Sequence, residues 1–164
     1  MHASERARRP EFIFAFPAYN VRNTEIGAII GRSQLPRLDD NNSLRRRNQT
    51  IFLANLDKEK FRTDFRIKGS SNYAFNLILK KPDKNYVKRL MKAMDNAKIE
   101  YRRGSAGGGN QLRQPYLKKY FKEKYYLEFP ETEHIHFYGF YLGNYPQLTQ
   151  EKIHKLCSLI NSIK

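Results

Sequence analysis

The chain has 164 residues and carries 31 lysines and arginines against 16 aspartates and glutamates, a formal net charge of +15. This charge calls for an anionic partner, such as nucleic acid, an acidic membrane or a phosphorylated small molecule, and does not choose among them. The single cysteine, Cys157, excludes an internal disulfide, and no apolar run approaches the length of a membrane span. Because the first nine residues lack the apolar core of a signal peptide, we expect a cytoplasmic protein.

The N-terminal third predicts a basic arm followed by two helices. Residues 1–10 are polar and without periodicity, so we expect a disordered arm there and a single α+β domain over 11–164. Asn23 or Thr24 can cap the first helix through a side-chain oxygen. The spacing of the following isoleucines predicts a buried stripe, made of Ile26, Ile29 and Ile30.

A second helix is predicted over 36–53, with Pro36 as its first residue. Its inward positions would be Leu38, Ile51 and Leu53. The run from Arg45 to Arg47 could bind phosphate, or it could be a solvated helix face. The opening segment and these long helices together would occupy residues 16–56.

Residues 61–164 predict a unit of strands and helices. The segments 63–67 and 73–79 alternate with period two around a Gly-Ser-Ser turn, which indicates a hairpin or a paired edge. Pro82 and Asp83 end the second strand and cap a helix over 84–97, and 99–103 returns as a strand. The inward side chains of the hairpin would be Phe65, Ile67, Tyr73, Phe75, Leu77 and Leu79, and those of the helix Tyr86, Leu90, Met91 and Met94. The fold class we expect is α+β, a small antiparallel or mixed sheet of three to four strands packed against helices.

The segment from Gly104 to Gln114 breaks every periodic pattern. Three consecutive glycines cannot hold a regular element, so this loop is either a loose connection or a place where the backbone comes very close to something. Arginines stand at its entrance and an amide and arginine cluster at its exit, which suits an anionic molecule rich in hydroxyls. Alternation along the strand sends the two entrance arginines to opposite faces. The candidate ligand-binding residues here are Arg103, Gly107, Gly108, Asn110 and Arg113, and the alternative is a mobile surface loop with solvated charges.

The last third predicts an aromatic strand over 136–143, then a short turn and a final helix capped by Thr149. His134 and His136 would share one face of an extended segment, but they lack enough company for a metal site. Cys157 falls in the apolar stripe of the final helix, so we expect a structural cysteine rather than a nucleophile. The Tyr-Gly-Phe sequence at 138–140 partly matches the aromatic strand of an RNA-recognition module.

The order of motifs resembles the DegT/DnrJ/EryC1/StrS family of sugar aminotransferases and nucleotide-sugar 3-dehydratases, which are fold-type-I pyridoxal-phosphate enzymes. The resemblance covers Pro10 to the C-terminus and matches the second half of those enzymes. Residues 19–25, Tyr-Asn-Val-Arg-Asn-Thr-Glu, look like the family signature Tyr-Asn-x-Arg-x-Thr-Asp/Glu. The segments 99–104, 107–115 and 143–146 resemble one subgroup of the family.

This resemblance implies roles for three residues. The asparagine matching Asn20 reaches across a dimer interface to the cofactor phosphate of the neighbouring subunit. The arginine matching Arg22 lies beside it, near the substrate, and the arginine matching Arg103 faces the sugar nucleotide. The Pro-x-His segment that usually follows this strand is replaced here by the glycine loop.

The resemblance also implies what this chain should lack. In the family, the lysine that carries pyridoxal phosphate, or the histidine that replaces it in the dehydratases, lies in a large domain before this stretch. We therefore expect the small C-terminal domain of a nucleotide-sugar aminotransferase or dehydratase, acting on a 4-keto sugar nucleotide, which binds no cofactor covalently and is not catalytic alone. Its expected partner is a second copy of the chain or the missing large domain, rather than nucleic acid or membrane. The alternative is a basic α+β module that binds RNA or a phosphorylated ligand without catalysis.

Overall fold

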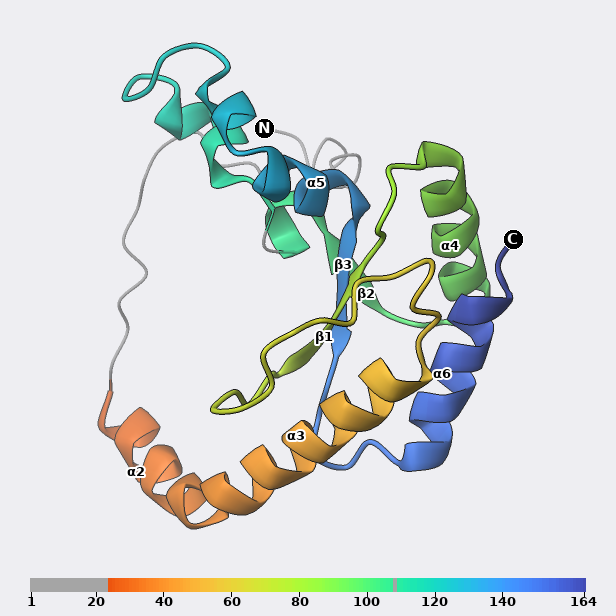
Figure 1. The fold of residues 1–164 in the computed structure, drawn as a ribbon. Helices are drawn as coiled ribbons and strands as arrows, with labels where there is room; N and C mark the ends of the chain where they lie inside the picture. Colours follow the sequence, from red (N-terminus) through yellow and green to blue (C-terminus); the bar gives the residue numbers. More distant parts are fainter. Residues whose placement is uncertain (1–23, 108) are drawn as a thin grey trace.

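The computed structural model describes residues 24–107 and 109–164, which form an α+β fold around a three-stranded antiparallel sheet (Figure 1). The strands are β1 (Ala74–Ile78), β2 (Tyr101–Arg103) and β3 (Gly139–Gly143), in the order β1-β3-β2. The central strand β3 pairs with β1 from Ala74↔Gly143 to Ile78↔Gly139 and with β2 from Tyr101↔Leu142 to Arg103↔Phe140. The predicted fold class is confirmed.

Five helices accompany the sheet in the described part of the chain: α2 (Glu25–Gln34), α3 (Leu38–Asn55), α4 (Lys84–Asn96), α5 (Pro130–Tyr138) and α6 (Gln150–Ser162). Short 3-10 turns connect them: η1 (Leu35–Arg37), η2 (Gly104–Gly107), η3 (Gln111–Arg113), η4 (Pro115–Leu117) and η5 (Tyr125–Glu128). The predicted caps are confirmed, because the side chains of Thr24, Asp83 and Thr149 accept backbone N–H groups of the first turns.

The core lies between α3, α4, α6 and one face of the sheet (Figure 1). Phe52 of α3 stacks on Phe75 of β1 with ring centroids 4.3 Å apart, and both side chains are fully buried. The predicted inward residues of α4 pack here, with Leu90 and Met94 completely buried, and Ile160 of α6 is completely buried beside them. Burying side chains of this size contributes about 1.5–3 kcal/mol each. The helix-covered face therefore holds most of the stability of the fold.

The predicted hairpin is wrong. Residues 63–67 form no strand, and β1 pairs with β3, which lies more than sixty residues further along the chain. Only an isolated bridge, between Phe61 and Leu79, joins the preceding segment to this region. Phe65 and Ile67 still pack against the core as partly buried side chains, whereas Tyr73 is 67% exposed. The inward direction of Phe65 and Ile67 was predicted correctly, but the strand and its pairing were not.

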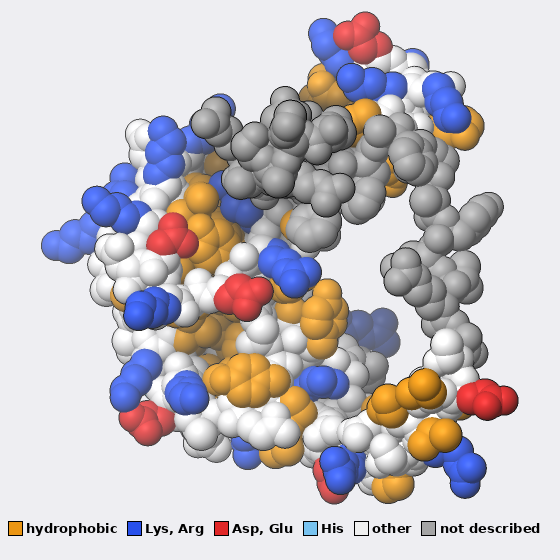
Figure 2. Space-filling model, turned by 180° about the vertical axis from the view of Figure 1, so that it is seen from behind, with side chains coloured by type: hydrophobic (Ala, Val, Ile, Leu, Met, Phe, Trp, Pro, Cys, Tyr) orange, Lys and Arg blue, Asp and Glu red, His pale blue; other side chains and the backbone are white. Residues whose placement is uncertain are grey.

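The predicted burial of the first helix is also wrong. The helix exists as α2, but its isoleucines Ile26, Ile29 and Ile30 are 56–71% exposed. Figure 1 shows why: α2 projects away from the sheet at the end of α3, and no described element lies over it. Its side chains form an exposed apolar patch at one end of the molecule (Figure 2). The second helix begins with the turn η1 around Pro36 and continues as α3, where Leu38 is 47% exposed rather than inward.

Helix α3 buries a glutamine whose side-chain amide makes no hydrogen bond to the described residues. Gln49 is 2% exposed, and neither its amide nitrogen nor its amide oxygen has a hydrogen-bond partner within the part of the chain that the structure describes. We expect Gln49→Met to raise the free energy of unfolding by about 1–2 kcal/mol, because it removes two unpaired polar groups at similar volume. Urea denaturation measures the change, with Gln34→Met on exposed α2 as the control. Destabilisation by Gln49→Met would contradict the prediction.

Candidate functional site

The glycine loop is a compact turn closed against α5. Gly104 has φ +58°, and the N–H of Gly109 donates to the carbonyl of Gly104 at 2.8 Å. A Cβ atom at Gly109 would lie 2.5 Å from both the Gly104 oxygen and the Nδ1 atom of His136. A side chain cannot fit there, so the loop needs glycine at 109 because its backbone approaches another part of the same chain. The sequence offered two explanations for the glycines, and close approach of the backbone holds at Gly109.

A buried polar network fixes the exit of this loop. Asn110 is 2% exposed, and its backbone N–H donates to Nδ1 of His136 at 3.1 Å. Its side-chain amide donates to Oε1 of Glu133 at 2.9 Å and to the carbonyl of Tyr126 at 3.1 Å. Because a backbone amide can only donate, Nδ1 of His136 carries no proton in this arrangement. The network holds the loop by both its backbone and its side chains.

Arg113 completes the network. Its guanidinium forms a two-pronged pair with the carboxylate of Glu133, with Nε to Oε1 at 2.8 Å and Nη2 to Oε2 at 2.5 Å. The guanidinium carbon also lies 4.1 Å from the ring centre of Tyr126 and 4.8 Å from that of Phe137. The hydrogen bond from Arg113 lowers the pKa of Glu133. The cluster of Asn110, Arg113, Glu133 and His136 is therefore a charged internal brace, here called the loop brace.

The two arginines of β2 lie on opposite faces of the sheet, as the alternation predicted. Arg103 points toward the helix side, where Nη2 donates to the carbonyl of Phe137 at 2.7 Å. Arg102 is exposed on the other face, with its guanidinium carbon 5.9 Å from the ring centre of Tyr141. Tyr73 packs on the same ring at 5.9 Å, and Tyr141 raises the pKa of Tyr73. The sequence did not single out this group, because its members come from three strands or strand ends far apart in the chain.

The remaining predicted site residues are only partly placed. Asn20, Arg22 and Gly108 lie outside the described residues. Gly107 ends the turn η2. The structure thus brings Asn110 and Arg113 together through Glu133 and places Arg103 against the end of α5. The roles of all seven residues toward a cofactor or substrate remain predictions.

The motif Gly-Asn-Tyr-Pro at 143–146 has a structural explanation. Asn144 is 2% exposed, and its side-chain amide donates to the carbonyls of Arg45 at 3.0 Å and Asn72 at 2.9 Å. Its side-chain oxygen accepts from Asn48 at 3.2 Å. Asn48 also donates to the carbonyl of Tyr145 at 3.2 Å. One asparagine therefore links α3, the start of β1 and the end of β3.

The two histidines and the cysteine that the sequence singled out lie on different helices, α5 and α6. His134 and His136 lie on helix α5 and not on a strand, because the strand β3 begins only at Gly139. Within residues 24–107 and 109–164 no three metal-ligating side chains come together. Cys157 is buried, as predicted, and its burial raises the thiol pKa to about 12.

Two further properties bear on the kind of partner. Phe140, one of the aromatic residues that suggested RNA stacking, is 2% exposed and packs in the core. Among the described residues, no helix is long and apolar enough to cross a membrane.

The comparison with known proteins decides the family. The sequence model of the DegT/DnrJ/EryC1/StrS aminotransferase family matches residues 1–161. The chain belongs to this family. Its relatives include a GDP-4-keto-6-deoxy-D-mannose 3-dehydratase of Yersinia pseudotuberculosis, 31% identical over 91% of this chain, and one of Escherichia coli, 30% identical over 82%. The chain spans about 38% and 34% of the length of these two relatives.

Solved structures agree with this assignment. A GDP-4-keto-6-deoxymannose-3-dehydratase with a trapped PLP-glutamate geminal diamine matches with a TM-score of 0.73 and 29% identity, over 90% of this chain and 38% of that one. The E. coli GDP-4-keto-6-deoxy-D-mannose-3-dehydratase with bound hydrated PLP matches with a TM-score of 0.72 and 29% identity, over 91% and 38%. A sugar aminotransferase of Streptococcus pneumoniae, 15% identical with a TM-score of 0.71, covering 93% of this chain and 38% of that one, shows the same fold.

Arg103 and Arg113, two of the predicted ligand-binding residues, make contacts within the chain. The two arginines nearest the glycine loop, Arg103 and Arg113, are held by the Phe137 carbonyl and the Glu133 carboxylate.

Proposed function

We propose that this chain is the C-terminal portion of a pyridoxal-phosphate enzyme that acts on a nucleotide-linked 4-keto sugar. Removal of the 3-hydroxyl from a GDP-linked 4-keto-6-deoxy sugar is the first candidate reaction, ahead of amino transfer. One observation carries this choice: the relatives at 29–31% identity that cover nine-tenths of the chain are 3-dehydratases. The aminotransferase structures at 14–20% identity support the fold alone.

The proposal gives this chain a binding role. Asn20 would contact the cofactor phosphate of a partner subunit, and Arg22 and Arg103 would contact the sugar nucleotide. Gly107 and Gly108 would bring backbone amides close to the ligand, while the loop brace holds the end of the loop at Asn110 and Arg113. A loop fixed in advance loses less conformational entropy on binding than a mobile one. That is the physical reason to place a charged brace under a glycine-rich segment.

Catalysis would need residues from the part of the relatives that this chain does not match. Pyridoxal phosphate acts as an electron sink when bound, and the protein around it supplies orientation and proton transfer. By the family resemblance, the lysine or histidine that performs the proton transfer lies in a part of the relatives that this chain does not match. We propose that the 164 residues alone bind no pyridoxal phosphate covalently, and that they function as a homodimer joined to a large domain.

A chimaera tests the proposal. The matching C-terminal segment of the E. coli 3-dehydratase is replaced by this chain, and conversion of GDP-4-keto-6-deoxy-D-mannose is measured. We expect activity in the chimaera, and a decrease of about tenfold or more in kcat/KM for Arg22→Ala, because one charge-assisted contact to a substrate is worth roughly 1.5–3 kcal/mol.

Arg32→Ala provides the control, because Arg32 lies on exposed α2 ten residues away. It should leave kcat/KM within about twofold. A chimaera that folds, dimerises and binds the cofactor but converts none of the substrate would reject the proposed substrate. An equal loss of activity with Arg22→Ala and Arg32→Ala would reject the specific role of Arg22.

A further inference from the structure

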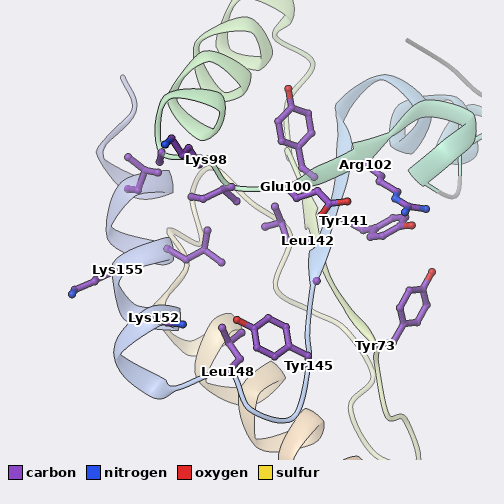
Figure 3. Close-up of a pocket in the computed structure, with 16 residues that line it drawn as sticks. Tyr73, Lys98, Glu100, Arg102, Tyr141, Leu142, Tyr145, Leu148, Lys152 and Lys155 are labelled. Carbon is purple, nitrogen blue, oxygen red and sulfur yellow. The ribbon is translucent and has the colours of Figure 1, made fainter. Parts of the chain in front are cut away.

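A cavity of about 950 Å³ lies at the edge of the sheet, away from the glycine loop (Figure 3). It is bounded by α6, by the segment that leads from α4 into β2, and by the loop that follows β3. The cavity exists because β3 runs further than its neighbour: β2 pairs only with Phe140 to Leu142, whereas Gly143 is paired with Ala74 of β1 alone. The missing length of β2 leaves a notch in the sheet.

The inner wall of the notch is apolar. Leu142 and Leu148 are buried behind it, and Leu156 and Leu159 of α6 line one side as half-buried side chains. Ile99 lines the opposite side and is also half-buried. A ligand that enters must therefore cover apolar surface, which favours a compact aromatic or branched body.

The rim is cationic. Lys98, Arg102, Lys152 and Lys155 line the cavity against a single acid, Glu100. Figure 3 shows Lys152 near one end of α6 and Lys98 beside the other end, while Lys155 points outward from the helix. Lys155 is paired with Glu151 at 2.6 Å. The other three cations have no ion pair within 4.0 Å in the described ranges, so positive charge is available beside an apolar wall.

We propose that this notch binds a small organic anion with an apolar body and one carboxylate, sulfonate or phosphate group. The apolar body would cover the leucines of α6, and the anionic group would lie beside one of the two lysines without an ion pair, Lys98 or Lys152. Binding in this notch does not depend on the nucleotide-sugar function proposed above.

Two fluorescent probes with nearly the same aromatic rings distinguish the contribution of charge to binding from that of apolar contact. 1-Anilinonaphthalene-8-sulfonate is an anion, and N-phenyl-1-naphthylamine is neutral. In titrations of the full chain, Lys98→Glu combined with Lys152→Glu should weaken binding of the sulfonate by about tenfold or more, because two favourable charges become repulsive. Binding of the neutral probe should change by less than about twofold, since the wall is unaltered.

The matched control is Lys118→Glu combined with Lys119→Glu, which changes net charge equally at two exposed residues after η4. It should leave binding of the sulfonate nearly unchanged at moderate salt. Amide chemical shifts of the unmodified chain locate the probe, and we expect the largest changes around Ile99, Leu156 and Leu159. Equal weakening by both double variants, or shift changes centred on the isoleucines of α2, would overturn the proposal.

Discussion

Glu133→Ala should lower the free energy of unfolding by about 2–3 kcal/mol, because it leaves a charged arginine and a buried amide without their acceptor. Glu133 receives two bonds from Arg113 and one from Asn110, and its side chain is only 13% exposed. The Arg113 side chain is 29% exposed, so water can take over part of the lost contact. For that reason the expected loss lies below that of a fully buried pair. Thermal and urea denaturation measure it.

The same pair predicts a dependence on pH. Arg113 lowers the pKa of Glu133 in the folded chain, so folding is favoured while the carboxylate stays charged. This contribution is complete above the unfolded pKa of about 4.3 and is lost as the pH falls toward the lower folded value. The difference in stability between the unmodified chain and Glu133→Ala should therefore shrink in that acidic range. An unchanged difference throughout acid titration would contradict the assignment.

Glu131→Ala is the matched control, because Glu131 lies on the same helix and is also paired with an arginine. Its bond to Arg62 spans 2.7 Å, but its side chain is 75% exposed, and water screens the pair. We expect almost no change in stability for Glu131→Ala. Equal losses in the two variants would mean that the loop brace contributes no more than a surface ion pair.

The features that the sequence predicted correctly depend on neighbouring residues. Thr24, Asp83 and Thr149 begin their helices because each side-chain oxygen reaches an N–H two or three residues ahead. The inward face of α4 follows from the spacing of Tyr86 and Leu90 alone. Opposite directions for Arg102 and Arg103 follow from the pleat of any strand. None of these features requires knowledge of what lies elsewhere in the chain.

The features that the sequence missed depend on distant partners. The strand β1 pairs with β3 and not with the segment 63–67, although both carry apolar residues at alternate positions, so local alternation does not choose between them. The isoleucines of α2 have the period of a buried stripe, but periodicity reports which face is apolar and not what covers it.

The sequence predicted the glycine loop of the candidate site but not the loop brace that holds it. Asn110 and Arg113 were recognisable because they flank glycines. Glu133 and His136 lie twenty or more residues further on, and His136 was considered only for a metal site and as part of an extended segment. Their real positions follow from α5, a helix where an extended segment was predicted. Pro130 at its start and Glu131 and Glu133 in its first turn are the local signal that could have identified this helix.

Asn144→Asp should lower the free energy of unfolding by roughly 3 kcal/mol, although it changes a single side-chain group. The amide of Asn144 donates to the carbonyls of Arg45 and Asn72, and an aspartate would present an oxygen to one of these carbonyls in a site that is 2% exposed. A buried carboxylate without a donor at that position raises its own pKa, so the variant should recover part of its stability at acidic pH. Urea denaturation at neutral and acidic pH measures both effects.

Asn85→Asp is the control, because it makes the same chemical change at an exposed residue in the first turn of α4, where a negative charge is favourable. Its stability should equal or slightly exceed that of the unmodified chain. A cycle of Asn48→Ala and Asn144→Ala adds a second measurement, since residues that share a hydrogen bond should show a coupling energy of about 0.5–3 kcal/mol. Additive losses, together with a tolerated Asn144→Asp, would mean that the Gly-Asn-Tyr-Pro motif does not hold α3 to the sheet and that another contact does.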